Sequence, residues 1–324
     1  MYEQFYGLTA KPFQLRPDPN FYFGSKGHKR ASYYLEYGLS QEEGFIVITG
    51  EIGAGKTTLL RNLFQSLPTQ HIVAAQIVNS SLDAENVLRM VAIAFGIKCE
   101  GETKATILTK IENFLRECNR QGKRVLLLVD EAQNLTPHSL EELRMLSNFQ
   151  TAEKSLLQTF LLGQPEFRRT LLSKDMKQLQ QRVIATYHLG PLDIAETKSY
   201  IEHRLRTVGW NGDPSFRDEA FVEIFNFTGG IPRKINSLCD RLLLMGFLEK
   251  LHVFGKPEIE AVIKDLQQEF ILPPAEDDEV ETPDISLGDM NIRLSRLEHS
   301  VTSILDLLKQ VLLSSIKKLP KDKE

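Results

Sequence analysis

A glycine-rich stretch, GEIGAGKTT at residues 50–58, carries the residue types that can hold a phosphate chain. It fits the spacing G-x-x-x-x-G-K-[ST], with an additional glycine at Gly53. Glycines let backbone N–H groups turn toward an anion that any Cβ would crowd. Lys56 would reach the β- and γ-phosphates, and the Thr57 hydroxyl would be a ligand of Mg²⁺. The residues expected to bind a nucleoside triphosphate are Gly50, Glu51, Ile52, Gly53, Ala54, Gly55, Lys56, Thr57 and Thr58.

Two acidic residues follow a second apolar run. Residues 125–129, VLLLV, are typical of a central parallel strand covered on both faces. Asp130 would then lie at the carboxyl end of that strand, where open α/β sheets bind ligands, and would bind Mg²⁺ through water. Glu131 would polarise the water that attacks the γ-phosphate. The two segments together predict binding and hydrolysis of ATP or GTP.

Strand and helix patterns alternate around these segments. Strands are expected at 45–49, 71–78, 125–129, 156–163 and 184–189, with helices at 57–67, 83–95, 103–120, 139–149 and 174–183. This order predicts a parallel, doubly wound α/β domain over residues 1–190. Gln164 follows the fourth strand and could bond the attacking water or the γ-phosphate, although a plain turn glutamine fits as well.

After Gly190-Pro191 the pattern is helical only. Segments 194–208, 218–227, 233–248 and 258–269 predict a small all-helical lid over residues 191–270. Two arginines stand near its borders, Arg182 before the fifth strand and Arg233 at the start of the third lid helix. An arginine near the γ-phosphate can stabilise transition-state charge, from the same chain or from a neighbour. Taken singly, each fits a surface or salt-bridged role better.

Composition narrows the class of protein. The 324 residues carry a formal net charge of −4, and residues 271–324, with 7 Lys+Arg and 11 Asp+Glu, account for all of it. The balanced remainder argues against a dedicated nucleic-acid binder. Cys99, Cys118 and Cys239 have no metal-ligand spacing and are expected to be reduced thiols of a cytosolic protein. Neither a signal peptide nor an apolar run of about 18 residues is evident.

The motifs resemble a known family. GEIGAGKTT, LLLVDEAQ, Arg182 and GGIPRK occur in the order of the phosphate loop, magnesium strand, arginine finger and lid arginine of AAA+ ATPases. LEELRMLSNFQ, LLGQPEF and QRVIATYHLGPL are similar to the general secretion pathway protein A group, over about residues 1–270. Within that group the chain most resembles the secretion ATPases encoded with exosortase and exopolysaccharide-export systems.

The resemblance implies roles for several residues. Gln164 falls at the family's first sensor, Arg182 at the finger that acts on a neighbouring subunit, and Arg233 at the lid sensor. Ile231 and Pro232 would lie near the base, as would the segment PDPNFYFGSKGH at residues 17–28, which includes Phe23 and His28. The cofactors implied are ATP and Mg²⁺. The transmembrane helix and peptidoglycan-binding domain of longer members are not expected here.

The C-terminal part differs in composition from the rest of the chain. Residues 271–287 are rich in proline and acids and are expected to be a disordered linker. A heptad pattern in 288–319 predicts an amphipathic or coiled-coil helix. The apolar seam begins one residue earlier and is Leu287, Met290, Leu294, Leu297, Val301, Ile304, Leu308 and Val311. Self-association or partner docking, folding back on the lid, and lying on a membrane surface all remain open.

These features predict an AAA+ ATPase whose cycle is coupled to an envelope secretion or exopolysaccharide-export system. We expect a homo-oligomer that is cytoplasmic or peripheral at the inner membrane, with export proteins as partners. A DNA-binding AAA+ regulator of the transposition type is the alternative, although no basic tail or helix-turn-helix pattern supports it.

Overall fold

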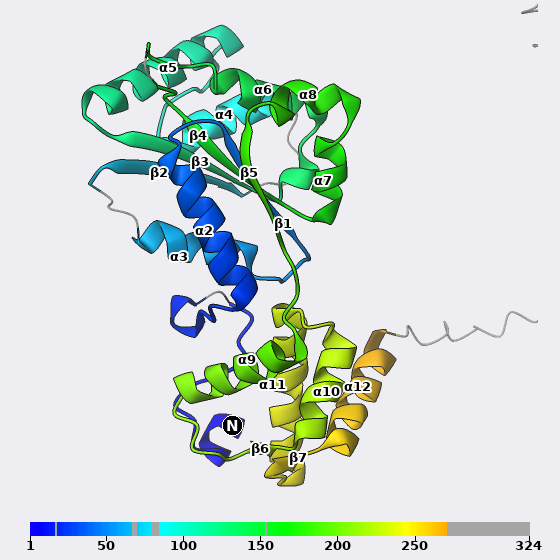
Figure 1. Ribbon diagram of the computed structural model, residues 1–324. Helices are drawn as coiled ribbons and strands as arrows, with labels where there is room; N and C mark the ends of the chain where they lie inside the picture. Colours follow the sequence, from blue (N-terminus) through cyan, green and yellow to red (C-terminus); the bar gives the residue numbers. More distant parts are fainter. Residues whose placement is uncertain (17, 67–69, 79–83, 153, 271–324) are drawn as a thin grey trace, which may run out of the picture. The chain divides into compact units, whose positions relative to one another are not determined.

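The computed structural model describes residues 1–270 apart from 17, 67–69, 79–83 and 153. Among these residues, five parallel strands form one sheet in the order β2-β3-β4-β1-β5 (Figure 1). They are β1 Phe45–Gly50, β2 Ile72–Val78, β3 Arg124–Asp130, β4 Gln158–Gly163 and β5 Val183–Leu189. The interior strands β1 and β4 are buried throughout, and β3 is buried from its second residue, as their apolar runs require. The prediction of a parallel α/β fold is confirmed.

Helices cover both faces of the sheet because alternate strand residues point to opposite sides. Phe45 and Val47 of β1 join one buried cluster, whereas Ile46 and Ile48 join the other. The first cluster is closed by α4 (Ala84–Ala94), α5 (Lys104–Arg120), α6 (Pro137–Leu146) and α7 (Pro165–Leu171). The second is closed by α2 (Lys26–Ser40) and α3 (Lys56–Ser66). The carboxyl ends of β1, β3 and β4 therefore open at one edge, where the predicted site residues lie.

The C-terminal helices of the described chain surround their own core. These are α9 (Ile194–Thr207), α10 (Asp218–Thr228), α11 (Pro232–Glu249) and α12 (Lys256–Phe270). The expectation of helices alone was wrong, because β6 (Ser215–Phe216) and β7 (Val253–Phe254) form a short parallel pair. The ring centres of Phe216 and Phe254 of this pair lie 5.3 Å apart with the ring planes tilted by 52°, and Phe254 is fully buried in the lid core. Two-residue strands of this kind leave no alternating pattern in the sequence.

The N-terminal segment packs with the lid helices, which the sequence did not indicate. Tyr2, Tyr6 and Phe13 are buried in the same core as α9 and α11. The Tyr6 hydroxyl donates a hydrogen bond to the Leu251 carbonyl at 2.9 Å. The segment includes α1 (Tyr2–Phe5) and the 3-10 turn η1 (Pro19–Phe21), neither of which was predicted. The first two dozen residues thereby connect the lid core to the phosphate-loop region.

The region between β4 and β5 also differs from the prediction of one helix at 174–183. Helix α7 begins at Pro165, and it is followed by η3 (Lys174–Met176) and α8 (Lys177–Gln180), while Val183 already belongs to β5. Proline is favourable in the first turn of a helix, because a backbone N–H there has no acceptor within the helix and its absence costs nothing. No helix was predicted at QPEF, so this signal was overlooked.

Several predictions fall outside the described residues. These are the linker at 271–287, the helix at 288–319 and the first residue of the helix expected at 83–95. Within the part of the chain that is described, no helix is both long enough and apolar enough to span a bilayer. Cys99, Cys118 and Cys239 are buried free thiols, in agreement with the prediction.

Candidate functional site

The turn between β1 and α3 depends on two glycines in the left-handed region. Gly53 and Gly55 have φ values of +82° and +99°. A Cβ added to Gly53 would lie 2.3 Å from Cβ of Arg233, and one added to Gly55 would lie 2.7 Å from Nε2 of His28. Any larger residue would therefore be strained and would collide with a neighbour. The loop follows the path expected of a phosphate-binding turn at the N-terminus of a helix.

Lys56 opens α3 and points back into this loop. Its ammonium donates hydrogen bonds to the carbonyls of Gly50 at 2.7 Å and Glu51 at 3.1 Å. The residue is 7% exposed, and this burial lowers the pKa of Lys56, while the charges of Glu131 and Asp130 oppose the change. A buried ammonium held by backbone carbonyls is well placed to bind a phosphate chain that enters the loop.

Thr57 and Asp130 meet where β1 and β3 end. The Thr57 hydroxyl donates to Oδ2 of Asp130 at 2.9 Å, and Oδ1 of Asp130 accepts from the backbone N–H of Glu131 at 3.0 Å. Asp130 is only 6% exposed. A hydroxyl and a buried carboxylate are oxygen donors of the kind Mg²⁺ prefers, with phosphate oxygens and waters completing its shell. These two residues fit the metal that was predicted for them.

Glu131 has a backbone conformation that is uncommon for its type. Its φ and ψ are 54° and 42°, in the left-handed region, which for a non-glycine residue costs on the order of 1 kcal/mol. Oε2 of its carboxylate accepts hydrogen bonds from Nε2 of Gln133 at 2.5 Å and from Nε2 of Gln164 at 3.2 Å. Burial alone would raise the pKa of Glu131, but these two bonds and the Lys56 charge lower it. The carboxylate is therefore held as an anion beside the loop.

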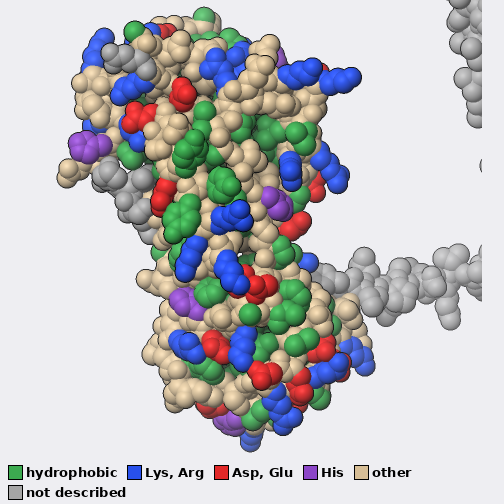
Figure 2. All heavy atoms as spheres, in the orientation of Figure 1, with side chains coloured by type: hydrophobic (Ala, Val, Ile, Leu, Met, Phe, Trp, Pro, Cys, Tyr) green, Lys and Arg blue, Asp and Glu red, His purple; other side chains and the backbone are tan. Residues whose placement is uncertain are grey.

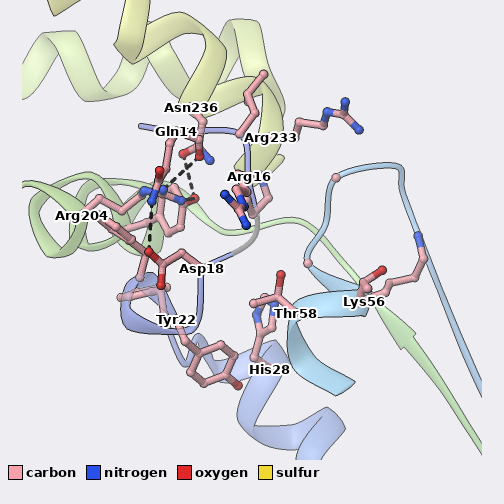
Figure 3. Close-up of a pocket in the computed structure, with 18 of the residues that line it drawn as sticks. Gln14, Arg16, Asp18, Tyr22, His28, Lys56, Thr58, Arg204, Arg233 and Asn236 are labelled. Carbon is pink, nitrogen blue, oxygen red and sulfur yellow. Dashed lines mark hydrogen bonds between the residues drawn. The ribbon is translucent and has the colours of Figure 1, made fainter. Parts of the chain in front are cut away.

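A cavity of about 400 Å³ lies over the phosphate loop, within the size range of small-molecule sites (Figure 3). The loop residues that line it are Ile52, Gly53, Gly55, Lys56, Thr57 and Thr58, and Glu131 lies at the same end. Its other walls come from the N-terminal segment and from the lid. Those lining residues are Gln14, Leu15, Arg16, Asp18, Phe21, Tyr22, Phe23, His28, Leu192, Tyr200, Arg204, Pro232, Arg233 and Asn236.

The end of the cavity away from Lys56 is organised by Arg204 of α9 (Figure 3). Its guanidinium donates to the carbonyls of Pro12 at 2.5 Å and Gln14 at 3.2 Å, and lies 4.6 Å from the ring centre of Phe21. It also donates to the Tyr200 hydroxyl at 2.9 Å. Tyr200 in turn donates to Oδ1 of Asn236 on α11 at 2.8 Å. Arg204 thereby joins the N-terminal segment to two lid helices.

Sequence reasoning did not identify Arg204, Tyr200 or Asn236. A single arginine in an amphipathic helix looks like an ordinary surface cation, and no local motif marks its partners. Gln133 was also missed, although it stands inside the quoted LLLVDEAQ. Its contact with Glu131 depends on the tight turn after β3, which the sequence pattern does not specify.

His28 lies under the phosphate loop rather than in the base end of the cavity. It is 6% exposed, and its Nδ1 is 2.7 Å from the Ser25 hydroxyl. Burial lowers the pKa of His28 to about 4, against smaller opposing effects of the Glu196 charge and a hydrogen bond with the Ala54 backbone. The ring is therefore neutral at pH 7 and supports the loop at Gly55.

The remaining predicted residues lie in different surroundings. Ile231 is the N-cap residue of α11 and is not among the described residues that line the cavity. Pro232 and Arg233 begin α11 and line the cavity, and the Arg233 backbone N–H donates to the Gly53 carbonyl at 3.3 Å. Arg182 is not among the described residues that line it. Its guanidinium donates to the Ser147 carbonyl at 3.3 Å, to the Ser147 hydroxyl at 3.1 Å and to Oδ1 of Asn148 at 2.5 Å, at the end of α6. A role for Arg182 in its own cavity is not supported by this geometry.

Comparison with known proteins agrees with the fold and the loop. Residues 39–171 match the AAA domain family. The chain is 40% identical over 253 residues to General secretion pathway protein A of Aeromonas hydrophila. The matched region covers 78% of this chain and 46% of that protein. Among solved structures, ORC2 of Aeropyrum pernix superimposes with a TM-score of 0.60 at 14% identity, covering 79% of this chain and 71% of its own. Cdc6p of Pyrobaculum aerophilum superimposes with a TM-score of 0.60 at 16% identity, covering 81% of this chain and 74% of its own.

The parallel sheet, the phosphate loop and the helical lid define an AAA+ nucleotide-binding protein. The two solved structures, at 14% and 16% identity, share that fold. Within the class, this AAA+ domain is of the general secretion pathway protein A type, as the 40% identity shows. The chain spans less than half the length of that relative.

Proposed function

We propose that this protein binds Mg-ATP and hydrolyses it, and that the cycle drives an envelope secretion or exopolysaccharide-export system. The observation that carries the proposal is the meeting of an ammonium, a hydroxyl and two carboxylates at the ends of β1 and β3. These groups belong to Lys56, Thr57, Asp130 and Glu131. Asp130 accepts hydrogen bonds from the Thr57 hydroxyl and the Glu131 backbone N–H, and Lys56 is held by the loop carbonyls. Each has a distinct task in phosphoryl transfer to water.

In this proposal Lys56 exchanges its carbonyl partners for the β- and γ-phosphates. Thr57 and Asp130 would hold Mg²⁺, which neutralises charge on the phosphate oxygens. The Glu131 carboxylate accepts a proton from the attacking water as the bond from the water oxygen to the γ-phosphorus forms. The bond from the γ-phosphorus to the β–γ bridging oxygen breaks, and ADP and inorganic phosphate are released. Gln164 orients that water or the γ-phosphate. Arg233 binds phosphate from the lid, beside Pro232.

The base would occupy the opposite end of the cavity. Phe21, Tyr200 and Arg204 offer aromatic faces and a fixed cation, and Asn236 adds an amide. The sequence lacks an N/TKxD-type guanine signature, and we assign the base as adenine.

We further propose that Arg182 completes the active site of a neighbouring copy in a homo-oligomer. Its position directly before β5 and its absence from the described lining of its own cavity support this role. Hydrolysis would then require assembly, and a rate per molecule that rises with protein concentration would be its signature.

Coupling to export rests on the similarity to General secretion pathway protein A. We place the protein in the cytoplasm, peripheral at the inner membrane, with residues 288–319 as the segment that binds export proteins or a second copy. Deleting 288–324 should lower association and leave ATP binding intact. Unchanged association after the deletion would contradict this assignment.

A Glu131→Gln variant tests the proposal, because it should bind ATP and fail to hydrolyse it. The variant is used as bait in nuclease-treated native lysate with ATP, and Lys56→Met is the matched bait that cannot hold the nucleotide. Recovery of export proteins by Glu131→Gln alone would support the proposal. Recovery of transposase-like proteins, lost after nuclease treatment, would favour the DNA-binding alternative. In the face shown in Figure 2, Lys and Arg are interspersed with Asp and Glu over the lid helices, which offers DNA no continuous basic field there.

A further inference from the structure

The turn after β3 directs one side chain back toward Glu131. Residues Ala132–Asn134 form the 3-10 turn η2, closed by a hydrogen bond from the Asn134 N–H to the Glu131 carbonyl at 3.0 Å. Ala132 is fully buried and anchors the turn in the core. Gln133 is half-buried on the site side, whereas Asn134 is exposed. The two neighbouring amides of this turn therefore have different surroundings.

Both ends of the Gln133 amide are bonded. Nε2 donates to Oε2 of Glu131 at 2.5 Å, and Oε1 accepts from the backbone N–H of Gln164 at 3.0 Å. The Gln164 side chain closes the triangle by donating to the same Oε2 at 3.2 Å. Three residues from the ends of β3 and β4 are thus joined by three hydrogen bonds.

The chemistry of the partners fixes the orientation of the amide. A backbone N–H can only donate, so the oxygen of Gln133 must face Gln164. The Glu131 carboxylate can only accept, so the nitrogen must face Glu131. A glutamate at position 133 would lack the donor, and a methionine would lack both groups. A glutamine meets both demands at this length.

The two bonds to Glu131 are not equivalent. The one from Gln164 comes from a side chain that the proposed function also directs at the nucleotide, so it is lost when Gln164 turns away. The one from Gln133 is secured at its other end by the Gln164 backbone, which cannot turn with the side chain. Gln133 can therefore hold the carboxylate throughout a cycle.

We propose that Gln133 is a positioning residue for ATP hydrolysis, which keeps the Glu131 carboxylate aimed at the attacking water while the Gln164 side chain engages the nucleotide. This inference rests on the proposed ATPase function and assigns a residue to the same site. Gln133 touches neither substrate nor metal in this role and acts through Glu131 alone.

Two variants separate its two bonds. Gln133→Glu keeps an acceptor for the Gln164 N–H and puts a like charge against Glu131, whereas Gln133→Met removes both bonds at similar length. Both should lower the single-turnover rate of ATP hydrolysis about 10- to 100-fold, since small misplacement of a reacting group has effects of that size. The Kd for ATP should stay within about twofold of the wild-type value. Asn134→Ala, in the same turn, is the matched control and should hydrolyse ATP at the wild-type rate.

A second measurement distinguishes positioning from a general structural role. In a Glu131→Gln background, Gln133→Met should cause no further loss of the residual single-turnover rate, because its target is already gone. Three results would overturn the inference. The first is a further loss of equal size in the Glu131→Gln background. The others are a Kd for ATP raised as much as the rate is lowered, and a wild-type rate in both Gln133 variants. Wild-type protein that does not hydrolyse ATP, or Glu131→Gln that does so normally, would instead overturn the proposed function and the inference with it.

Discussion

The two ends of the cavity are built in different ways. The phosphate end comes from the carboxyl ends of neighbouring strands, and its groups already pair with one another, as Lys56 does with loop carbonyls and Thr57 with Asp130. The base end comes from segments nearly two hundred residues apart, tied by Arg204 to the carbonyls of Pro12 and Gln14. The first set must exchange partners when a nucleotide binds. The groups of the base end form a fixed scaffold. The phosphate end therefore serves hydrolysis, and the base end serves recognition of the nucleotide.

The largest expected effect concerns a residue that belongs to neither end. Arg182→Ala should lower the hydrolysis rate of an assembled protein about a thousandfold with little change in ATP affinity, since arginine fingers contribute on this scale. Phosphate release is measured over a range of protein concentrations and after mixing with wild-type subunits. Arg120→Ala, a surface arginine paired with Glu117, is the control. A rate independent of concentration and of mixing would show that the phosphate end is complete within one copy.

Loss of the Lys56 ammonium should weaken nucleotide binding at the phosphate end of the cavity. Lys56→Met is expected to weaken ATP binding about 100-fold, because charge-assisted hydrogen bonds to phosphate are lost. The Kd is measured by calorimetry, together with the melting temperature. Lys123→Met, next to the start of β3 at the opposite edge of the sheet, should bind ATP normally. Near-normal affinity in Lys56→Met would mean that the base end supplies most of the binding.

A glycine comparison tests the packing of the phosphate loop. Gly55 and Gly122 both have positive φ, but a Cβ would meet His28 at Gly55 and nothing within 4 Å at Gly122. Gly55→Ala should therefore lower the free energy of unfolding by about 1–3 kcal/mol more than Gly122→Ala, and should also weaken ATP binding. Urea unfolding and ATP titration check both effects. Equal losses in the two variants would show that the contact with His28 is unimportant.

The smallest effect is a dependence on pH. Because burial lowers the pKa of His28 to about 4, the unfolded chain binds more protons than the folded protein between pH 6.5 and 4. Stability should therefore fall as the pH is lowered through that range, and His28 alone should contribute about 2 kcal/mol between pH 7 and pH 5. Urea unfolding at the two pH values is compared with that of His28→Gln. An identical loss in the variant would exclude His28 as its source.

The phosphate end was predictable from the sequence because contiguous patterns encode it. The FIVIT strand with its glycine loop, and VLLLV followed by Asp130-Glu131, gave the strands, the turn and the charged groups in correct order. The base end could not be predicted, because Arg204 bonds the carbonyls of Pro12 and Gln14 only when the N-terminal segment packs on the lid. Short elements such as α7 and the β6–β7 pair were missed for want of any periodic pattern. The role of Gln133 could not be predicted from the sequence, because it depends on the left-handed backbone conformation at Glu131.

The division into a chemical end and a recognition end is tested most directly by measuring two variants side by side. ATP affinity and the single-turnover rate at saturating protein are determined for Glu131→Gln and for Arg204→Ala. The account predicts that Glu131→Gln binds ATP with wild-type affinity and loses hydrolysis about a thousandfold. It predicts that Arg204→Ala binds about tenfold more weakly, yet hydrolyses bound ATP at the wild-type rate. Normal hydrolysis by Glu131→Gln, or an Arg204→Ala rate lost without loss of affinity, would contradict it.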